Sequence, residues 1–256
     1  MKVLASYNLK GGVGKTAAAV NLAWHAAAEG ARTLLVDLDP QGAASYYLRV
    51  DPGLPGGSEK FIGKKNHILR DIQPTAYANL KVVPADFSHR NMDLILSEEK
   101  HADDRLRRVL KPVADDYDYV FLDCPPGISL VSENVFNAAD ALLIPIIPTH
   151  LSLRAYDMLL DFCRDRGLHG QHFLPFFSML DRRRSLHVEL VQQFAAAHPE
   201  LLRVFVPYAS QIERMGVHQA PVGEFAGPSD PGRAFAALWS AIKERLAGSP
   251  DVVAGA

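Results

Sequence analysis

The residues best suited to chemistry stand near the start of the chain, where the sequence reads KGGVGKT. Glycine lacks a Cβ, so Gly11, Gly12 and Gly14 allow a sharp turn in which successive N–H groups point at an anion. Lys15 would contact the β- and γ-phosphates of a nucleotide, and the Thr16 hydroxyl would ligate Mg²⁺. The spacing therefore predicts a binding site for a nucleoside triphosphate.

A phosphate loop needs a strand before it and a helix after it, and the sequence indicates both. Residues 3–7 form a short apolar run suited to a buried strand, and residues 17–24 are rich in alanine, which favours helix. A helix that begins at the loop adds the positive end of its dipole to the phosphate site. This order of strand, tight loop and helix is typical of nucleotide-phosphate loops.

Two further apolar runs end in carboxylates. Residues 33–37 lead into Asp37 and Asp39, and residues 119–123 end in Asp123. Open α/β sheets bind ligands at the carboxyl ends of their strands, so we expect these acids to lie near the phosphate loop. Turn formation and helix capping are the alternative roles for Asp37 and Asp39. We leave Asp37 out of the chemistry for that reason.

Strand and helix signals alternate along the chain, and the strands are almost continuously apolar. This pattern predicts a three-layer, doubly wound α/β fold with a mostly parallel sheet and helices on both faces. We expect one nucleotide-binding domain over residues 1–247, a flexible tail over residues 248–256, and a loop rich in glycine and proline over residues 50–65. The expected strands cover residues 3–7, 33–37, 81–83, 119–123, 141–147, 173–179 and 203–206, and the expected helices residues 16–29, 103–113, 132–137, 153–166, 186–198 and 231–247.

Composition narrows the class of protein. The chain has 256 residues, of which 48% are apolar and 22% charged, and this indicates a globular protein with a sizeable core. Its net charge of −2 means that any contact with nucleic acid must use a local basic patch. Cys124 and Cys163 are the two cysteines, so no disulfide framework is indicated and a reducing cytoplasm is the simplest setting. We expect Cys124 to be a buried structural residue rather than a nucleophile.

The phosphate loop departs from the common pattern GxxxxGK(S/T), because Leu9 stands where the first glycine should be and Lys10 precedes the two glycines. With this deviant loop, the DLDPQG stretch around Asp39 and the strand that ends at Asp123, the chain resembles the ParA/MinD family of deviant Walker A ATPases. It is most similar to the short Soj-like ParA ATPases, which include the McdA type that positions carboxysomes. The resemblance covers about residues 1–246 and is most specific in the first half.

The resemblance implies a slow, Mg²⁺-dependent ATP hydrolase that forms a homodimer with ATP between its subunits. Lys10 would reach the phosphates bound by the partner subunit, and Asp39 would help to place the attacking water. The implied catalytic residues are Lys10, Lys15 and Asp39, and the implied Mg²⁺ site comprises Thr16, Asp39 and Asp123. The implied nucleotide contacts are Gly11, Gly12, Val13, Gly14, Lys15, Thr16, Ala17 and Gln41 at the phosphates and Asp181 and Pro207 near the adenine.

Non-specific binding to DNA is the next property that the resemblance implies. The candidate residues are Arg182, Arg183, Arg184, Arg214, Lys243 and Arg245. A solvated basic face is the alternative at each position, and Tyr208 and Gln211 stand where Soj-like members usually carry arginine. The implied protein is cytoplasmic and associated with the nucleoid. A ParB-like or cargo-adaptor partner would stimulate its hydrolysis, so that a plasmid, a chromosome or a protein organelle is positioned.

A MinD-like regulatory ATPase that acts without DNA is the main alternative. MinD-like members end in a basic amphipathic helix that lies on lipid, and this chain has an apolar stripe near its end. We expect the stripe to pack against the core instead of a membrane, because only two basic residues, Lys243 and Arg245, accompany it. The stripe consists of Phe235, Leu238, Trp239, Ile242 and Leu246. A metal-transfer ATPase is a weaker alternative, because the two cysteines lack the paired spacing that it needs.

Overall fold

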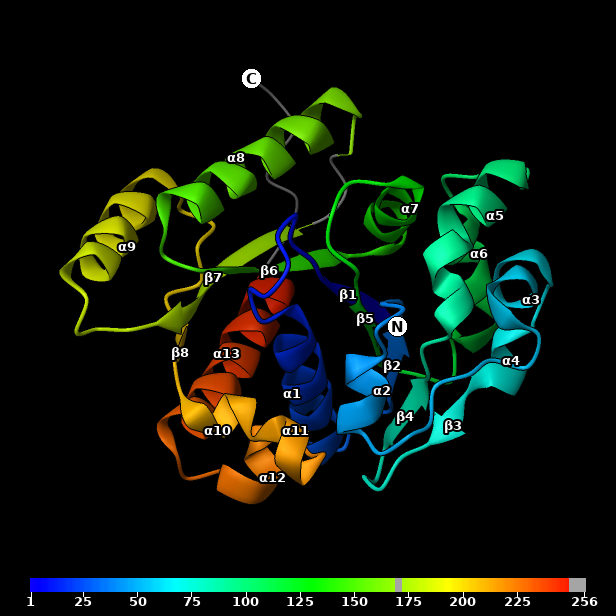
Figure 1. The fold of residues 1–256 in the computed structure, drawn as a ribbon, viewed down its shortest axis with the longest axis horizontal. Helices are drawn as coiled ribbons and strands as arrows, with labels where there is room; N and C mark the ends of the chain where they lie inside the picture. The colour runs from blue at the N-terminus through cyan, green and yellow to red at the C-terminus, as the bar shows by residue number, and fades with distance from the viewer. Residues whose placement is uncertain (169–171, 249–256) are drawn as a thin grey trace.

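An eight-stranded sheet forms the centre of the protein in the computed structural model, which describes residues 1–168 and 172–248 (Figure 1). Its strands lie in the order β3-β4-β2-β5-β1-β6-β7-β8. Every neighbouring pair is parallel except β3 and β4, which run antiparallel at one edge. The strands are β1 Lys2–Ser6, β2 Thr33–Asp37, β3 Gln73–Pro74, β4 Leu80–Val83, β5 Tyr119–Asp123, β6 Ala141–Ile146, β7 His172–Leu180 and β8 Phe205–Pro207.

Helices cover both faces of this sheet, and each face has its own apolar cluster. One face packs against α1 and α13, and the other packs against α5 to α9 (Figure 1). The helices are α1 Lys15–Ala28, α2 Ala43–Tyr47, α3 Gly57–Gly63, α4 Ile68–Asp71, α5 Met92–Glu98, α6 Arg105–Leu110, α7 Leu130–Ala138, α8 His150–Asp165, α9 Ser185–Ala197, α10 Ser210–Glu213, α11 Met215–His218, α12 Val222–Ala226 and α13 Asp230–Ala247, with 3-10 turns at Phe87–Asn91 and Lys111–Val113.

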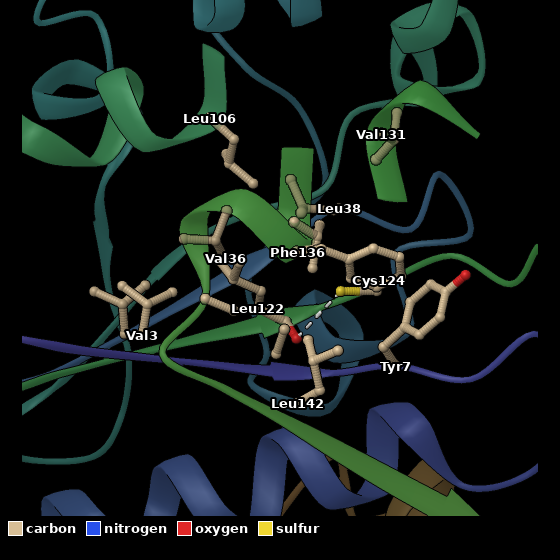
Figure 2. Packing of buried hydrophobic residues seen from close by; sticks show 14 of the residues in the cluster. Val3, Tyr7, Val36, Leu38, Leu106, Leu122, Cys124, Val131, Phe136 and Leu142 are labelled. Carbon is tan, nitrogen blue, oxygen red and sulfur yellow. Dashed lines mark hydrogen bonds between the residues drawn. The ribbon is translucent and has the colours of Figure 1, made fainter. Parts of the chain in front are cut away.

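The strands serve both clusters because successive side chains point to opposite faces of a sheet. In β5, Val120 and Leu122 join the cluster under α5 to α9, whereas Phe121 joins the cluster under α1 and α13. Figure 2 shows part of the first cluster, in which Leu122 packs with residues such as Val36 and Phe136. The predicted three-layer, doubly wound and mostly parallel architecture is therefore confirmed.

The apolar stripe near the end of the chain belongs to the core. Phe235, Leu238, Trp239 and Ile242 of α13 are buried, and the Trp239 ring meets the Tyr119 ring edge-on at a centroid distance of 5.0 Å. The prediction that this stripe packs inside the protein is confirmed. None of the helices in residues 1–168 and 172–248 has the length and apolar character needed to cross a bilayer.

The prediction of a loop over residues 50–65 is wrong for its second half, which forms helix α3. The glycines that suggested a loop provide the turn into this helix, since Gly53, Gly56 and Gly57 have positive φ angles. Phe61 and Ile62 are then buried against the rest of the core. The sequence also did not predict the strand β3 or the helices α2, α4, α5, α10, α11 and α12. Of the predicted tail over residues 248–256, only Gly248 lies within the described residues.

Candidate functional site

The phosphate loop joins β1 to α1 at the carboxyl end of β1 (Figure 1). Gly12 and Gly14 have φ angles of 71° and 96°, a region that other residues rarely adopt. Gly14 meets a second constraint, because a Cβ atom there would lie 2.9 Å from Ser178 Oγ. Gly11 has neither constraint, and it is exposed at the mouth of the loop together with Gly12. The loop thus has the shape that a phosphate-binding turn requires.

Two polar residues that the sequence reading missed hold this loop in place. The Ser6 hydroxyl donates to the Lys15 carbonyl at 2.8 Å, where α1 begins. The Asn8 side chain donates to the Pro145 carbonyl of β6 at 2.8 Å and accepts from the Lys10 backbone N–H at 2.9 Å. The signal in the sequence was a polar residue at the end of an apolar strand, Ser6, followed two positions later by Asn8.

Lys15 lies inside the loop, with only 6% of its surface exposed. Its ammonium group donates to the Lys10 carbonyl at 3.0 Å. Burial lowers the pKa of Lys15, and the nearby Asp123, Cys124 and Asp39 act in the opposite direction. The cation is therefore held at the centre of the loop by one backbone contact, which leaves donor hydrogens for a phosphate.

Asp123 lies beside Lys15 and is completely buried, and neither of its carboxylate oxygens has a hydrogen-bond partner among the described groups. Burial and the neighbouring Asp37 raise the pKa of Asp123, whereas the Thr16 hydroxyl and Lys15 act to lower it. A buried carboxylate without partners is costly unless a cation accompanies it. The arrangement thus fits a Mg²⁺ ion that the Thr16 hydroxyl and the acids at the strand ends would hold.

Asp37 is paired with Asp123 in the register of β2 and β5, but its carboxylate, unlike that of Asp123, has hydrogen-bond partners. Its carboxylate accepts from the Ser45 backbone N–H at 2.8 Å and from the Ser45 hydroxyl at 2.7 Å, which ties the start of α2 to the sheet. Burial is the main cause that raises the pKa of Asp37 to about 6. The structural role that we expected for Asp37 agrees with these contacts.

Asp39 lies one turn before α2 and is half-buried. One carboxylate oxygen accepts the Gln41 backbone N–H at 2.9 Å, which forms a tight turn. The negative charge of Asp39 affects the pKa values of both Lys15 and Asp123, so the three side chains share one electrostatic environment. The structure therefore brings together Lys15, Thr16, Asp39 and Asp123, and their catalytic and metal-binding roles remain predictions.

Lys10 is half-buried, and its hydrogen bonds with other described residues involve only its backbone N–H and carbonyl groups. Among the residues that the structure describes, no acid forms an ion pair with its ammonium group. The cation is thus available to a group outside this chain. Val13 is buried behind the loop and Ala17 follows it in the first turn of α1, so both contribute mainly backbone to the site.

Tyr7, for which the sequence predicted no role beyond the strand, connects the start of the phosphate loop to the loop after β5. The Tyr7 hydroxyl donates to the Gly127 carbonyl at 2.8 Å, and its ring meets the Phe136 ring edge-on at 4.7 Å. Cys124 lies nearby and is buried, with its thiol donating to the Leu122 carbonyl at 3.6 Å (Figure 2). Burial raises the pKa of the Cys124 thiol, which agrees with the expected structural role.

Asp181 and Pro207 border one cavity of about 690 Å³, at the carboxyl ends of β7 and β8. The Asp181 carboxylate is engaged by the Arg183 guanidinium in two hydrogen bonds of 2.8 and 2.9 Å. This pair lowers the pKa of Asp181 to about 2. The cavity is large enough for a nucleobase, but the adenine contacts of Asp181 and Pro207 remain predictions.

The candidate DNA-binding residues lie in separate places on the surface of a single subunit and do not form one patch. Arg182 stacks over the Phe205 ring at 4.4 Å, beside the exposed Arg184. Lys243 forms an ion pair with Glu29. It lies far from Arg182, because Arg233, which lines the same cavity as Arg182, is ten residues or about 15 Å earlier along α13. Arg214 is exposed between α10 and α11, and Arg245 is half-buried. Their contact with DNA remains a prediction.

The fold and this loop define a P-loop nucleotide-binding protein. Residues 1–166 match a family model described as an AAA domain. Over 249 residues the chain is 30% identical to the chromosome-partitioning ATPase Soj of Treponema pallidum, which covers 95% of this chain and 98% of that protein. The chain therefore belongs to the Soj/ParA family of partition ATPases within the wider ParA/MinD group.

Solved structures agree on the fold. McdA from Cyanothece, in a variant solved as an ATP complex, matches with a TM-score of 0.82 and 22% identity over 95% of this chain and 96% of that one. Cobyrinic acid a,c-diamide synthase from Mycobacterium smegmatis, solved with ADP and magnesium, matches with a TM-score of 0.79 and 23% identity over 97% and 96%. At 22% and 23% identity, these matches show a shared fold and do not identify a function.

Proposed function

We propose that this protein is a ParA-type ATPase that closes into a homodimer around ATP and Mg²⁺ and binds DNA in that closed state. The observation that carries the proposal is the ammonium group of Lys10, which has no acidic partner among the described residues and belongs to the residue directly before the exposed Gly11 of the phosphate loop. A cation in this position is suited to a nucleotide held by a second copy. Residues 1–247 would act as one ATPase domain.

The proposed reaction is attack of water on the γ-phosphate. Lys15, the loop N–H groups and the partner's copy of Lys10 would stabilise the charge that develops on the phosphate oxygens. Asp39 would orient the attacking water, and Gln41 would lie beside the γ-phosphate. Mg²⁺, which Thr16, Asp39 and Asp123 would hold, supplies positive charge at the phosphates. A site of this kind supports slow turnover, which suits a molecular switch.

The closed dimer would then present basic residues from both subunits to the DNA backbone. A ParB-like or cargo-adaptor protein would accelerate hydrolysis, open the dimer and release the DNA. Repeated cycles of this kind would hold the protein on the nucleoid in the cytoplasm and position a plasmid, a chromosome or a protein organelle. We infer no membrane step, because the apolar face of α13 is used in the core.

The proposal predicts that DNA of random sequence binds the protein only when ATP and Mg²⁺ are present, and that binding weakens between 50 and 200 mM salt, by roughly 10³-fold if about six phosphates are contacted. Electrophoretic mobility or fluorescence anisotropy with a short duplex measures this. Arg184→Gln should weaken binding, whereas Arg90→Gln, at an arginine that stacks on Phe87 far from the candidate residues, should not. ATP-dependent dimers without any DNA binding would instead favour a MinD-like regulator.

A further inference from the structure

A strongly basic pair of adjoining hollows lies between α3, α4 and α6, away from the phosphate loop. Their volumes are about 260 and 440 Å³, and they share Lys64, Lys65, Asn66 and His67. Among the residues that line them there is no aspartate or glutamate. The cations that line them are Lys64, Lys65, Arg70, Arg105, Arg108 and Lys111. In a chain of net charge −2, this is a marked local excess of positive charge.

Four of these six cations have no side-chain partner among the described residues. Arg105 and Arg108 form ion pairs with Glu99 at 3.5 Å and Asp104 at 3.3 Å. The side chains of the other four, namely Lys64, Lys65, Arg70 and Lys111, make no ion pair or hydrogen bond with any described residue. Unpaired cations that converge on a concave surface repel one another, and an anion would relieve that repulsion.

The walls of these hollows are fixed by buried polar contacts. Arg105 donates to the Ile62 carbonyl at 2.7 Å and to the Gly63 carbonyl at 2.8 Å, which joins the end of α3 to α6. At the floor, His67 is 8% exposed and its Nδ1 lies 3.1 Å from a carboxylate oxygen of the fully buried Asp71. Among residues 1–168 and 172–248, only the Nδ1 atom of this ring has a hydrogen-bond partner. An imidazolium at this position would donate from Nδ1 to Asp71 and from Nε2 to a bound anion.

The position of the hollows separates them from the nucleotide site. Arg108 and Lys111 also line a cavity with Met1, Val3 and Asp140, the residues at the amino ends of β1 and β6. The phosphate loop follows the carboxyl end of β1, so the length of this five-residue strand, about 16 Å, lies between the two edges. Figure 1 shows α3, α4 and α6 grouped together at the side of the molecule away from α9 and α13.

We propose that these hollows bind a small anion with two or more phosphate groups, at a site independent of the ATP site. Lysine, arginine and imidazolium are the donors that phosphate groups prefer. The concave shape, with a nearly buried histidine at its floor, favours a compact polyphosphate over the extended backbone of a nucleic acid. Such a ligand would contact α3, α4 and α6 together. Helix α3 lies in the segment that connects the turn at Asp39 to strands β3 and β4.

The test measures binding of inorganic tripolyphosphate to full-length protein by calorimetry at about 150 mM salt, where weak surface attraction is largely screened. The Lys15→Ala background removes binding at the phosphate loop. We expect saturable binding with one ligand per chain, weakened at least about tenfold by Lys64→Gln/Lys65→Gln. The matched double variant Lys2→Gln/Lys81→Gln, at exposed lysines on the sheet strands β1 and β4, should bind as the background does.

A second measurement follows the His67 imidazole by NMR. Bound tripolyphosphate should shift the NMR resonances of this ring, whereas a histidine that does not contact the anion would show no such change. Absence of saturable binding, an equal loss in both double variants, or no change at His67 would overturn the proposal. Loss of duplex DNA affinity in Lys64→Gln/Lys65→Gln without tripolyphosphate binding would overturn it in favour of a nucleic-acid surface. A melting temperature equal to that of the background confirms that each variant is folded.

Discussion

Replacing Lys15 with alanine is expected to weaken ATP binding by roughly 30-fold to several thousand-fold. The loss corresponds to about 2–5 kcal/mol, the usual effect of removing one partner from a buried, hydrogen-bonded charge pair. Lys15 is almost completely buried in the loop, and its ammonium group donates to the Lys10 carbonyl. A melting curve of the variant separates the loss of ATP binding from any loss of stability. Calorimetry with a nonhydrolysable ATP analogue and Mg²⁺ measures the effect directly.

The control for this experiment is Lys2→Ala. Lys2 is an exposed lysine at the amino end of β1, the strand that precedes the loop, and its ammonium group lies 3.9 Å from Asp140. Its removal should leave nucleotide affinity unchanged. If Lys15→Ala bound ATP as tightly as the natural protein, the phosphate loop would not be the nucleotide site.

Replacing Asp39 with alanine is expected to reduce ATP turnover by roughly 10²- to 10⁴-fold while ATP binding is retained, the range usual for removal of a group that orients or activates a nucleophile. Asp39 is half-buried next to Lys15 and Asp123, and its second carboxylate oxygen is not needed for the turn with Gln41. Phosphate release under steady-state conditions measures the turnover. The variant should also remain on DNA for longer once ATP has bound.

Asp39→Asn separates the two roles of this side chain. Asparagine retains an oxygen that can accept the Gln41 N–H and so preserves the turn, but it lacks the charge. We expect Asp39→Asn to lose turnover nearly as fully as Asp39→Ala. Full activity in Asp39→Asn would show that Asp39 only shapes the turn, and rapid release of Asp39→Ala from DNA would count against the switch.

The sequence predicted every strand except β3, and the phosphate loop, because these features depend on local patterns. An apolar run, three glycines and a lysine are readable without tertiary contacts. Helix α3 was not predicted because its glycines and prolines favour a loop locally. It forms because Phe61 and Ile62 reach the core and because Ser58 forms hydrogen bonds with Ser88 and His89, about 30 residues later in the chain.

The different roles of similar side chains also depend on contacts distant in sequence. Asp37 and Asp123 both end apolar strands, yet Asp37 accepts hydrogen bonds from Ser45, whereas the Asp123 carboxylate has no hydrogen-bond partner in the described part of the chain. Nothing in the local pattern distinguishes them. Tyr7 likewise gives no local indication of its hydrogen bond to Gly127, which lies 120 residues away. The residues of the phosphate loop could thus be named from the sequence, but the groups that hold them in place required the structure.

The central claim is that ATP joins two copies of this protein through Lys10. Sedimentation velocity with Mg²⁺ and a nonhydrolysable ATP analogue, on the natural protein and on Lys10→Ala, tests it most directly. We predict a two-chain species for the natural protein and a one-chain species for Lys10→Ala, which should still bind the analogue because its Lys15 is intact. A natural protein that stays a single chain when saturated with nucleotide, or a Lys10→Ala variant that dimerises equally well, would contradict the account.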